Sequence, residues 1–222
     1  ESVNDAPTIA LPESFTFQED GSLTVGFAEY LDDVDTEFLS LSASGNENVT
    51  VTIDELNVTF SAVQDWNGTE TITFIVDDLR RRLTAEDSVE VIVTPVNDAP
   101  VLADIGDQST PEDVPLTLSL IADDVDGDVL DFTVVSGSPV DVSVSMEGTE
   151  LTLTPALNFN GTVEISVTVS DGFADDSEVF TLTVESVNDA PTLDLPFGFT
   201  FFEDGSLTED FSIYADDIDE DE

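Results

Sequence analysis

One pentapeptide, Val-Asn-Asp-Ala-Pro, occurs three times in this chain, at residues 3–7, 96–100 and 187–191. The copies start 93 and 91 residues apart, as 96 − 3 and 187 − 96 show. A fixed period of this length predicts similar structural units arranged in tandem. We therefore expect domains at residues 1–95 and 96–186, and the N-terminal part of a third domain at 187–222.

Three further motifs recur in the same order, the first two in all three repeats and the third in the first two repeats. They are a Glu-Asp pair (19–20, 112–113, 203–204), an Asp-Asp-x-Asp block (32–35, 123–126, 216–219) and an aromatic-Asn-Gly triplet (66–68, 159–161). Residues 1–8 also recur letter for letter at 185–192, which indicates a two-domain super-repeat in a longer parent protein. The third copy holds sequence for about two strands, so we expect it to be unfolded alone or to pair with strands outside this sequence.

Within a repeat, apolar and polar residues alternate with a period of two. Such runs cover 49–53, 71–76, 89–93, 151–154, 163–169 and 180–184. This alternation is typical of half-buried strands, and Gly, Pro, Asn and Asp separate the runs. About seven short strands in one repeat predict an all-β fold of tandem immunoglobulin-like Greek-key β-sandwiches.

The charge of the chain is strongly one-sided, with 51 acidic residues, three basic residues and a formal net charge of −48. The basic residues form one run, Arg80–Arg82. This run is interpreted either as a solvated loop or as a docking point for an acidic neighbour. Nucleic acid is excluded as a partner because neutralising phosphates needs distributed cations. No apolar stretch is long enough for a membrane span. Hydrophobic residues still make up 40% of the chain, which supplies folded cores rather than disorder.

Catalysis has few residues to use, because His, Cys and Lys are all absent. Carboxylate chemistry, such as glycoside hydrolysis, remains, but it needs one raised-pKa acid facing a second carboxylate in a cleft. Acids that recur in every repeat indicate a structural role, so we expect no enzyme activity.

The order of strands in an antiparallel sandwich decides where the acidic motifs lie. The Glu of the Glu-Asp pair and the Asn-Gly loop reach the C-terminal end of a domain. The Asp-x-Asp block and the Asp after the sixth strand reach the N-terminal end. Two successive domains therefore direct their acids at one shared Asn-Asp-Ala-Pro linker, where Pro ends the strand ladder.

These ordered motifs resemble the cadherin-like repeats of large bacterial surface adhesins, in particular the dystroglycan-type cadherin-like domains. The resemblance covers essentially the whole chain and implies calcium ions at each junction between domains. Calcium suits such clusters, since it accepts about 6–8 oxygen ligands in flexible geometry. Bound calcium would then turn a hinge of mutually repelling carboxylates into a rigid rod.

The resemblance implies three sets of calcium ligands. At the first junction they are Glu19, Asp65, Asn67, Asn97, Asp98, Asp124, Asp126, Asp128 and Asp171. At the second junction they are Glu112, Asn158, Asn160, Asn188, Asp189, Asp217 and Asp219. A half-site at the N-terminal end comprises Asn4, Asp5, Asp33, Asp35 and Asp78.

Two departures from animal cadherins affect these sites. Ala99 and Ala190 stand where the animal linkers carry a second Asn, and the Asn-Gly loop carries fewer carboxylates. We therefore expect one or two ions per junction instead of three. No Trp near the chain start matches the strand-swapping residue of animal cadherins, so strand swapping is not expected.

The leading hypothesis is a calcium-rigidified structural or adhesive array on the outside of a bacterial or archaeal cell. It would act as a stalk, a fibre or a biofilm matrix component, with further copies of its own repeats and a surface glycan or protein receptor as partners. One alternative is a carbohydrate-binding accessory module of a secreted glycan-active protein, which predicts an exposed aromatic platform. Another is that the acidity reflects adaptation to high salt, without bound calcium.

Overall fold

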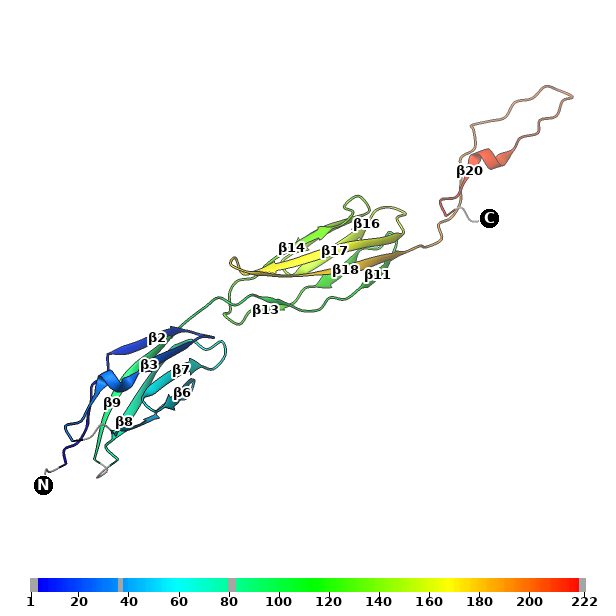
Figure 1. The fold of residues 1–222 in the computed structure, drawn as a ribbon. Helices are drawn as coiled ribbons and strands as arrows, with labels where there is room; N and C mark the ends of the chain where they lie inside the picture. Colours follow the sequence, from blue (N-terminus) through cyan, green and yellow to red (C-terminus); the bar gives the residue numbers. More distant parts are fainter. Residues whose placement is uncertain (1–3, 36–37, 80–82, 220–222) are drawn as a thin grey trace. The chain divides into compact units, whose positions relative to one another are not determined.

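The computed structural model describes residues 4–35, 38–79 and 83–219, and it divides the chain into two compact units, Glu1–Asn97 and Asp98–Glu222 (Figure 1). The Arg80–Arg82 run and the acidic tail at 220–222 lie outside the described residues. No helix within the described ranges is long and apolar enough to cross a membrane.

The first unit contains one two-sheet sandwich, called sandwich 1 here. Its four-stranded sheet has the order β2 (Ser14–Gln18), β9 (Thr84–Thr94), β8 (Gly68–Asp77) and β5 (Ser40–Ser44). Its three-stranded sheet has the order β3 (Ser22–Gly26), β7 (Asn57–Ala62) and β6 (Val49–Asp54). A short pair, β1 (Thr8–Ile9) with β4 (Leu31–Asp32), and the 3₁₀ turn η1 (Phe27–Tyr30) complete it. Strand β2 runs parallel to β9, whereas the other pairs are antiparallel.

The core of sandwich 1 is aromatic. Phe27, Phe60 and Phe74 are fully buried, and the ring centroids of Phe27 and Phe74 lie 4.7 Å apart. Phe15 on β2 packs on Phe60 at 5.5 Å, so rings from both sheets meet in the middle. The alternation seen in the sequence places these rings inward because side chains alternate between the two faces of a strand.

The second unit contains sandwich 2, with the same strand topology. Its larger sheet has the order β11 (Gln108–Pro111), β18 (Asp175–Glu185), β17 (Gly161–Ser170) and β14 (Asp131–Ser136). Its smaller sheet has the order β12 (Leu116–Ser119), β16 (Glu150–Pro155) and β15 (Val142–Glu147), and β10 (Val101–Leu102) pairs with β13 (Ala122–Asp123). Its buried core is mostly aliphatic, built around residues such as Leu151, Leu153 and Ile165.

The rest of the second unit, here the C-terminal segment (residues 192–219), repeats only the outline of residues 8–35. Strands β19 (Thr192–Leu193) and β20 (Ala215–Asp216) pair, and η2 (Phe211–Tyr214) precedes β20. Residues 199–208 match the strands β2 and β3 in sequence but form no strand. In sandwich 1, β2 and β3 form strands because β9 and β7 supply their hydrogen-bond partners. The C-terminal segment has no such partner strands among the described residues. The predicted all-β fold of tandem immunoglobulin-like sandwiches is confirmed.

Candidate metal sites

At the N-terminal end of sandwich 1, the five expected half-site residues come together from three places in the chain. The Asn4 side-chain amide donates to a carboxylate oxygen of Asp78, and the Asp5 N–H donates to Asp35 Oδ2 at 2.7 Å. The Asp35 N–H in turn donates to Asp33 Oδ1 at 2.7 Å. Asp78, directly after β8, is completely buried. These hydrogen bonds form two sets beside the Asn-Asp motif, Asn4 with Asp78 and Asp5 with Asp35 and Asp33.

At the opposite end of sandwich 1, Glu19 fixes the start of the linker. Its backbone N–H extends the β2–β9 ladder by donating to Thr94 O at 3.0 Å, which turns the side chain inward. The carboxylate is only 3% exposed and accepts from the Val96 N–H at 2.6 Å and from Asn67 Nδ2 at 3.3 Å. A buried carboxylate needs such donors to offset its lost hydration.

The Asn-Gly loop owes its shape to the glycine and the aromatic residue. Gly68 has φ +152°, and a Cβ there would lie 2.8 Å from the Trp66 ring. Trp66 itself packs against the core of sandwich 1. The loop therefore presents Asn67 toward Glu19, and Trp66 is part of the packing and not an exposed glycan platform.

The second residue of each Glu-Asp pair was not among the ligands expected from the sequence. Asp20 Oδ1 accepts from the Asp65 N–H at 3.4 Å, and the two carboxylates have oxygens within 4.8 Å of each other. In sandwich 2 the equivalent Asp113 Oδ1 accepts from the Asn158 N–H at 2.9 Å. The invariant Glu-Asp pairing in all three repeats was the signal that could have identified these residues.

The N-terminal end of sandwich 2 holds the clearest cluster of acids in the described residues. One carboxylate oxygen from each of Asp124, Asp126 and Asp128 lies within 4.8 Å of the others. The Asp128 N–H donates to Asp124 Oδ1 at 3.3 Å, and the Asp98 N–H donates to Asp126 Oδ2 at 2.8 Å. The loop thus gathers three like charges, which repel one another unless a cation neutralises them.

Asp124 provides a test of whether a cation fits. Its Oδ2 atom is buried and has no hydrogen-bond partner. A buried, unsatisfied carboxylate oxygen is costly, and a hard oxygen-binding cation would satisfy it. The donor set of carboxylates without nitrogen or sulfur ligands suits calcium or magnesium more than a transition metal.

Asp171 occupies the position in sandwich 2 that Asp78 occupies in sandwich 1, directly after the long strand β17. Its Oδ1 accepts from the N–H groups of Phe173 and Ala174 at 2.6 and 2.7 Å. One oxygen of Asp171 therefore holds its own turn in place.

In the second unit, the linker after β18 repeats the arrangement seen beside Glu19. Glu112 is 4% exposed, and its Oε1 accepts from the Val187 N–H at 2.5 Å. The Asp189 N–H donates to Asp219 Oδ2, and the Asp219 N–H donates to Asp217 Oδ1 at 3.1 Å. Asn188 Nδ2 donates to the Asp189 carbonyl at 2.7 Å, and Asn160 is exposed on the Asn-Gly loop.

Electrostatics at this linker centre on Asp189. Burial raises the pKa of its carboxyl, and the negative charges of Asp219, Glu112, Asp113 and Asp217 raise it further. A cavity of about 220 Å³ beside Asp189 is lined by Asn158, Ala190, Thr192 and Asp216, among others. Negative charges that raise the pKa of the Asp189 carboxyl mark a place where positive charge is favourable.

Repeated immunoglobulin-like sandwiches with acidic ends define a class of modular repeat protein, with no feature of an active site among the described residues. A family model described as "Bacterial Ig domain" matches residues 4–94 and 97–185. The chain therefore belongs to the bacterial Ig domain family, in two tandem copies. Both this family and the fold point to a non-catalytic repeat module.

Among curated proteins, none matches the chain. Among solved structures, a two-repeat EC1-2 fragment of human protocadherin-24 is 19% identical, with 82% of this chain and all of that chain covered and a TM-score of 0.54. A second crystal structure of that fragment gives 17% identity, 83% and 100% coverage and a TM-score of 0.50. These likenesses show the shared fold.

An endo-fucoidan hydrolase of glycoside hydrolase family 107 is 18% identical over 82% of this chain, with a TM-score of 0.38. This chain spans only 29% of the length of that hydrolase. The narrower expectation of a dystroglycan-type repeat class remains a prediction, whereas the cadherin-like architecture is supported by the protocadherin likeness.

Proposed function

We propose that this chain is a segment of an extracellular stalk or adhesive array of a bacterial or archaeal cell, made rigid by calcium at the linkers between its sandwiches. Three domains follow in register, at residues 1–95, 96–186 and from 187 onward. The observation that carries the proposal is the acidic cluster of Asp124, Asp126 and Asp128, whose buried Asp124 Oδ2 lacks a hydrogen-bond partner.

The first calcium junction uses ligands from both sides of the linker at Asn97 and Asp98. The ligands from sandwich 1 are Glu19, Asp65 and Asn67, joined by Asp20. The ligands from sandwich 2 are Asp124, Asp126, Asp128 and Asp171. Calcium accepts this many oxygens, and one ion shared by two domains removes the freedom of the linker between them.

The other two sites follow the same plan. The second junction uses Glu112, Asn158, Asn160, Asn188, Asp189, Asp217 and Asp219, with Asp113 added. The N-terminal group of Asn4, Asp5, Asp33, Asp35 and Asp78 supplies one side of a further site. The hydrogen bonds from the Asp5, Asp98 and Asp189 N–H groups to Asp35, Asp126 and Asp219 support one common design for all three.

An array of this kind suits the outside of a cell. Extracellular modules typically bind calcium with a dissociation constant of about 10⁻⁴–10⁻³ M, so sites of this kind fill only where calcium approaches millimolar concentration. Adhesion to a surface receptor, and assembly with further copies of the same repeats, would then depend on a stiff spacer.

Isothermal titration with calcium, with magnesium as the matched control, tests the proposal. We expect calcium to bind with a dissociation constant of about 10⁻³ M or tighter and magnesium to bind more weakly. Equal dissociation constants for the two ions, or no measurable binding of calcium, would refute the proposal.

A further inference from the structure

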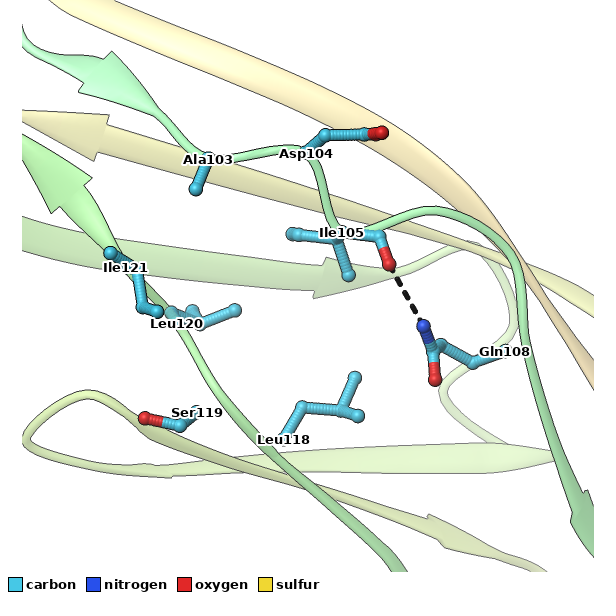
Figure 2. A pocket seen from close by; sticks show the side chains of 8 residues that line it. All are labelled: Ala103, Asp104, Ile105, Gln108, Leu118, Ser119, Leu120 and Ile121. Carbon is cyan, nitrogen blue, oxygen red and sulfur yellow. Dashed lines mark hydrogen bonds between the residues drawn. The ribbon is translucent and has the colours of Figure 1, made fainter.

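Sandwich 2 contains a partly open cavity of about 160 Å³, lined mainly by apolar side chains, that shares no lining residue with the candidate metal sites described above. Figure 2 shows its lining, which includes Ala103, Ile105, Leu118, Leu120 and Ile121 around one hollow. One of the polar groups in its lining is Gln108, whose Nε2 donates to the carbonyl oxygens of Ile105 and Gly106 at 2.8 and 3.3 Å. Gln108 thereby holds the 105–106 loop as one wall of the cavity.

The register of the sheets shows which side chain of sandwich 1 corresponds to Gln108. Phe15 stands opposite Val91 in the β2–β9 pair, and Gln108 stands opposite Leu182 in the β11–β18 pair. Val91 and Leu182 each lie five residues before the Val-Asn of the following linker. Gln108 therefore replaces a phenylalanine that is 8% exposed and packed in the aromatic core.

A second ring is lost at the turn before the Asp-Asp-x-Asp block. In sandwich 1 the Ala10 N–H donates to Tyr30 O, and in sandwich 2 the Ala103 N–H donates to Ile121 O, both at 2.9 Å. Tyr30 turns inward against Phe15, with ring centroids 6.0 Å apart. Sandwich 2 has no 3₁₀ turn at this point, and Ile121 is 62% exposed.

The cavity of sandwich 2 is thus the space that aromatic rings fill in sandwich 1. The C-terminal segment keeps the pair of rings found in sandwich 1: Phe199 and Tyr214 occupy the positions of Phe15 and Tyr30, and their ring centroids lie 6.1 Å apart. A volume of about 160 Å³ matches the roughly 150 Å³ of an engineered protein cavity that binds one benzene molecule. The size and lining suit a single six-membered aromatic ring.

The surroundings of the cavity are uniformly acidic. Asp104 belongs to its lining, Glu178 accepts from the N–H groups of Ile105 and Gly106, and Glu150 stands opposite Ser119 at the other wall. Residues 83–222 contain no Lys, Arg or His. A second copy of this surface would be repelled, whereas a cationic segment would be attracted.

We propose that this cavity is a docking site for one Phe or Tyr side chain of a basic partner polypeptide, with Lys or Arg residues flanking the aromatic residue. The ring occupies the space between Leu118, Leu120 and Ile105. The flanking cations lie near Asp104, Glu150 and Glu178. Sandwich 1 has no such site because Phe15 and Tyr30 fill the equivalent space.

The test uses the whole 222-residue chain and three peptides at about 0.15 M NaCl, where the Debye length of roughly 8 Å screens diffuse attraction. The peptides are acetyl-Lys-Phe-Lys-amide, acetyl-Lys-Ala-Lys-amide and acetyl-Glu-Phe-Glu-amide. Amide shifts in the NMR spectrum of the ¹⁵N-labelled chain locate the binding. We expect the Lys-Phe-Lys peptide to shift Ala103, Ile105 and Leu120, and to bind about 10- to 100-fold more tightly than the Lys-Ala-Lys peptide, from the burial of one ring.

Two variants and one control connect the binding to the cavity. Gln108→Phe restores the ring of sandwich 1, and Leu118→Phe fills the same space if the first variant fails to fold. Both should reduce binding of the Lys-Phe-Lys peptide by about tenfold or more. Ser109→Phe makes a similar change on the exposed face of β11 and should leave binding unchanged.

Three results would overturn the inference. The Lys-Phe-Lys and Lys-Ala-Lys peptides could shift the same amides with equal affinity, which would show attraction to acidic surface alone. Leu118→Phe could leave binding intact, or the Glu-Phe-Glu peptide could bind as tightly as the Lys-Phe-Lys peptide. None of these outcomes depends on calcium, so the docking site and the proposed calcium junctions fail or survive separately.

Discussion

Asp124→Asn should have opposite effects on the stability of sandwich 2 with and without calcium. Asparagine keeps an Oδ1 that accepts from the Asp128 N–H. It replaces the buried Oδ2, which has no hydrogen-bond partner, with an uncharged amide nitrogen. It also removes one of three charges whose oxygens lie within 4.8 Å of one another. The substitution therefore removes repulsion in the absence of the ion and a ligand in its presence.

The size of the effect follows from Coulomb's law. At the 4.8 Å limit, each carboxylate pair in water repels by about 0.9 kcal/mol, and screening at physiological salt reduces this to roughly 0.5 kcal/mol. Asp124 takes part in two such pairs, so its neutralisation should stabilise calcium-free sandwich 2 by about 1 kcal/mol. For a domain of this size, about 1 kcal/mol corresponds to a rise of roughly 4–8 °C in Tm.

Differential scanning calorimetry of the parent and the variant, in EDTA and in about 5 mM calcium, would measure the change in Tm. About 5 mM exceeds the dissociation constants of extracellular calcium modules, which reach roughly 10⁻³ M. The variant should melt higher than the parent in EDTA and gain less on adding calcium. Asp123→Asn is the matched control, because Asp123 is exposed on β13 next to the cluster. A variant that melts lower than the parent in EDTA, yet gains as much from calcium, would refute the reasoning.

Three further predictions concern sandwich 1, each read from urea unfolding. Burial raises the pKa of Glu70, but hydrogen bonds from the N–H groups of Asn48, Val49 and Glu47 outweigh burial and lower that pKa overall. The ionised Glu70 carboxylate therefore stabilises the fold fully above its unfolded pKa near 4.3, and this stabilisation is lost as pH falls through the folded pKa. Glu70→Gln should cost about 1 kcal/mol at pH 7, and this cost should shrink as pH falls through the lowered pKa of folded Glu70; a pH-independent difference would contradict this. Phe27→Ala should cost about 3–5 kcal/mol because that fully buried ring contacts four others, and a loss under about 1 kcal/mol would be inconsistent with the packing. Gly68→Ala should cost about 1–3 kcal/mol, because its Cβ would meet the Trp66 ring at 2.8 Å, and an unchanged midpoint would count against this.

The alternation of residues such as those at 71–76 and 163–169 was enough to predict the sandwiches, since side-chain period fixes which face is buried. The order of the strands also predicted the end of the sandwich at which each acidic motif lies, because strand direction fixes the end that each loop reaches. The grouping of Asn4 with Asp78 and of Asp5 with Asp35 follows from this reasoning.

Other features depend on three-dimensional packing that a period does not encode. Asp20 and Asp113 were not among the expected ligands, and only their hydrogen bonds to the Asp65 and Asn158 backbones place them beside those ligands. The cavity beside Gln108 arises from a ring replaced in one strand and a turn shortened elsewhere, positions separated by more than ten residues. The alignment of the repeats shows both replacements, but the sequence does not show that the two positions lie beside one pocket.

Small-angle X-ray scattering during a calcium titration tests the central claim most directly. Magnesium and about 1 M NaCl serve as parallel conditions. In about 1 M NaCl the Debye length is roughly 3 Å, so the carboxylates are screened without any bound calcium. Millimolar calcium should narrow the distribution of radii of gyration of the chain to that of one stiff rod. Magnesium and NaCl should leave the broad distribution of a hinged chain. A distribution that calcium does not change, or that NaCl narrows equally well, would contradict calcium-dependent rigidity and favour acidity as an adaptation to salt.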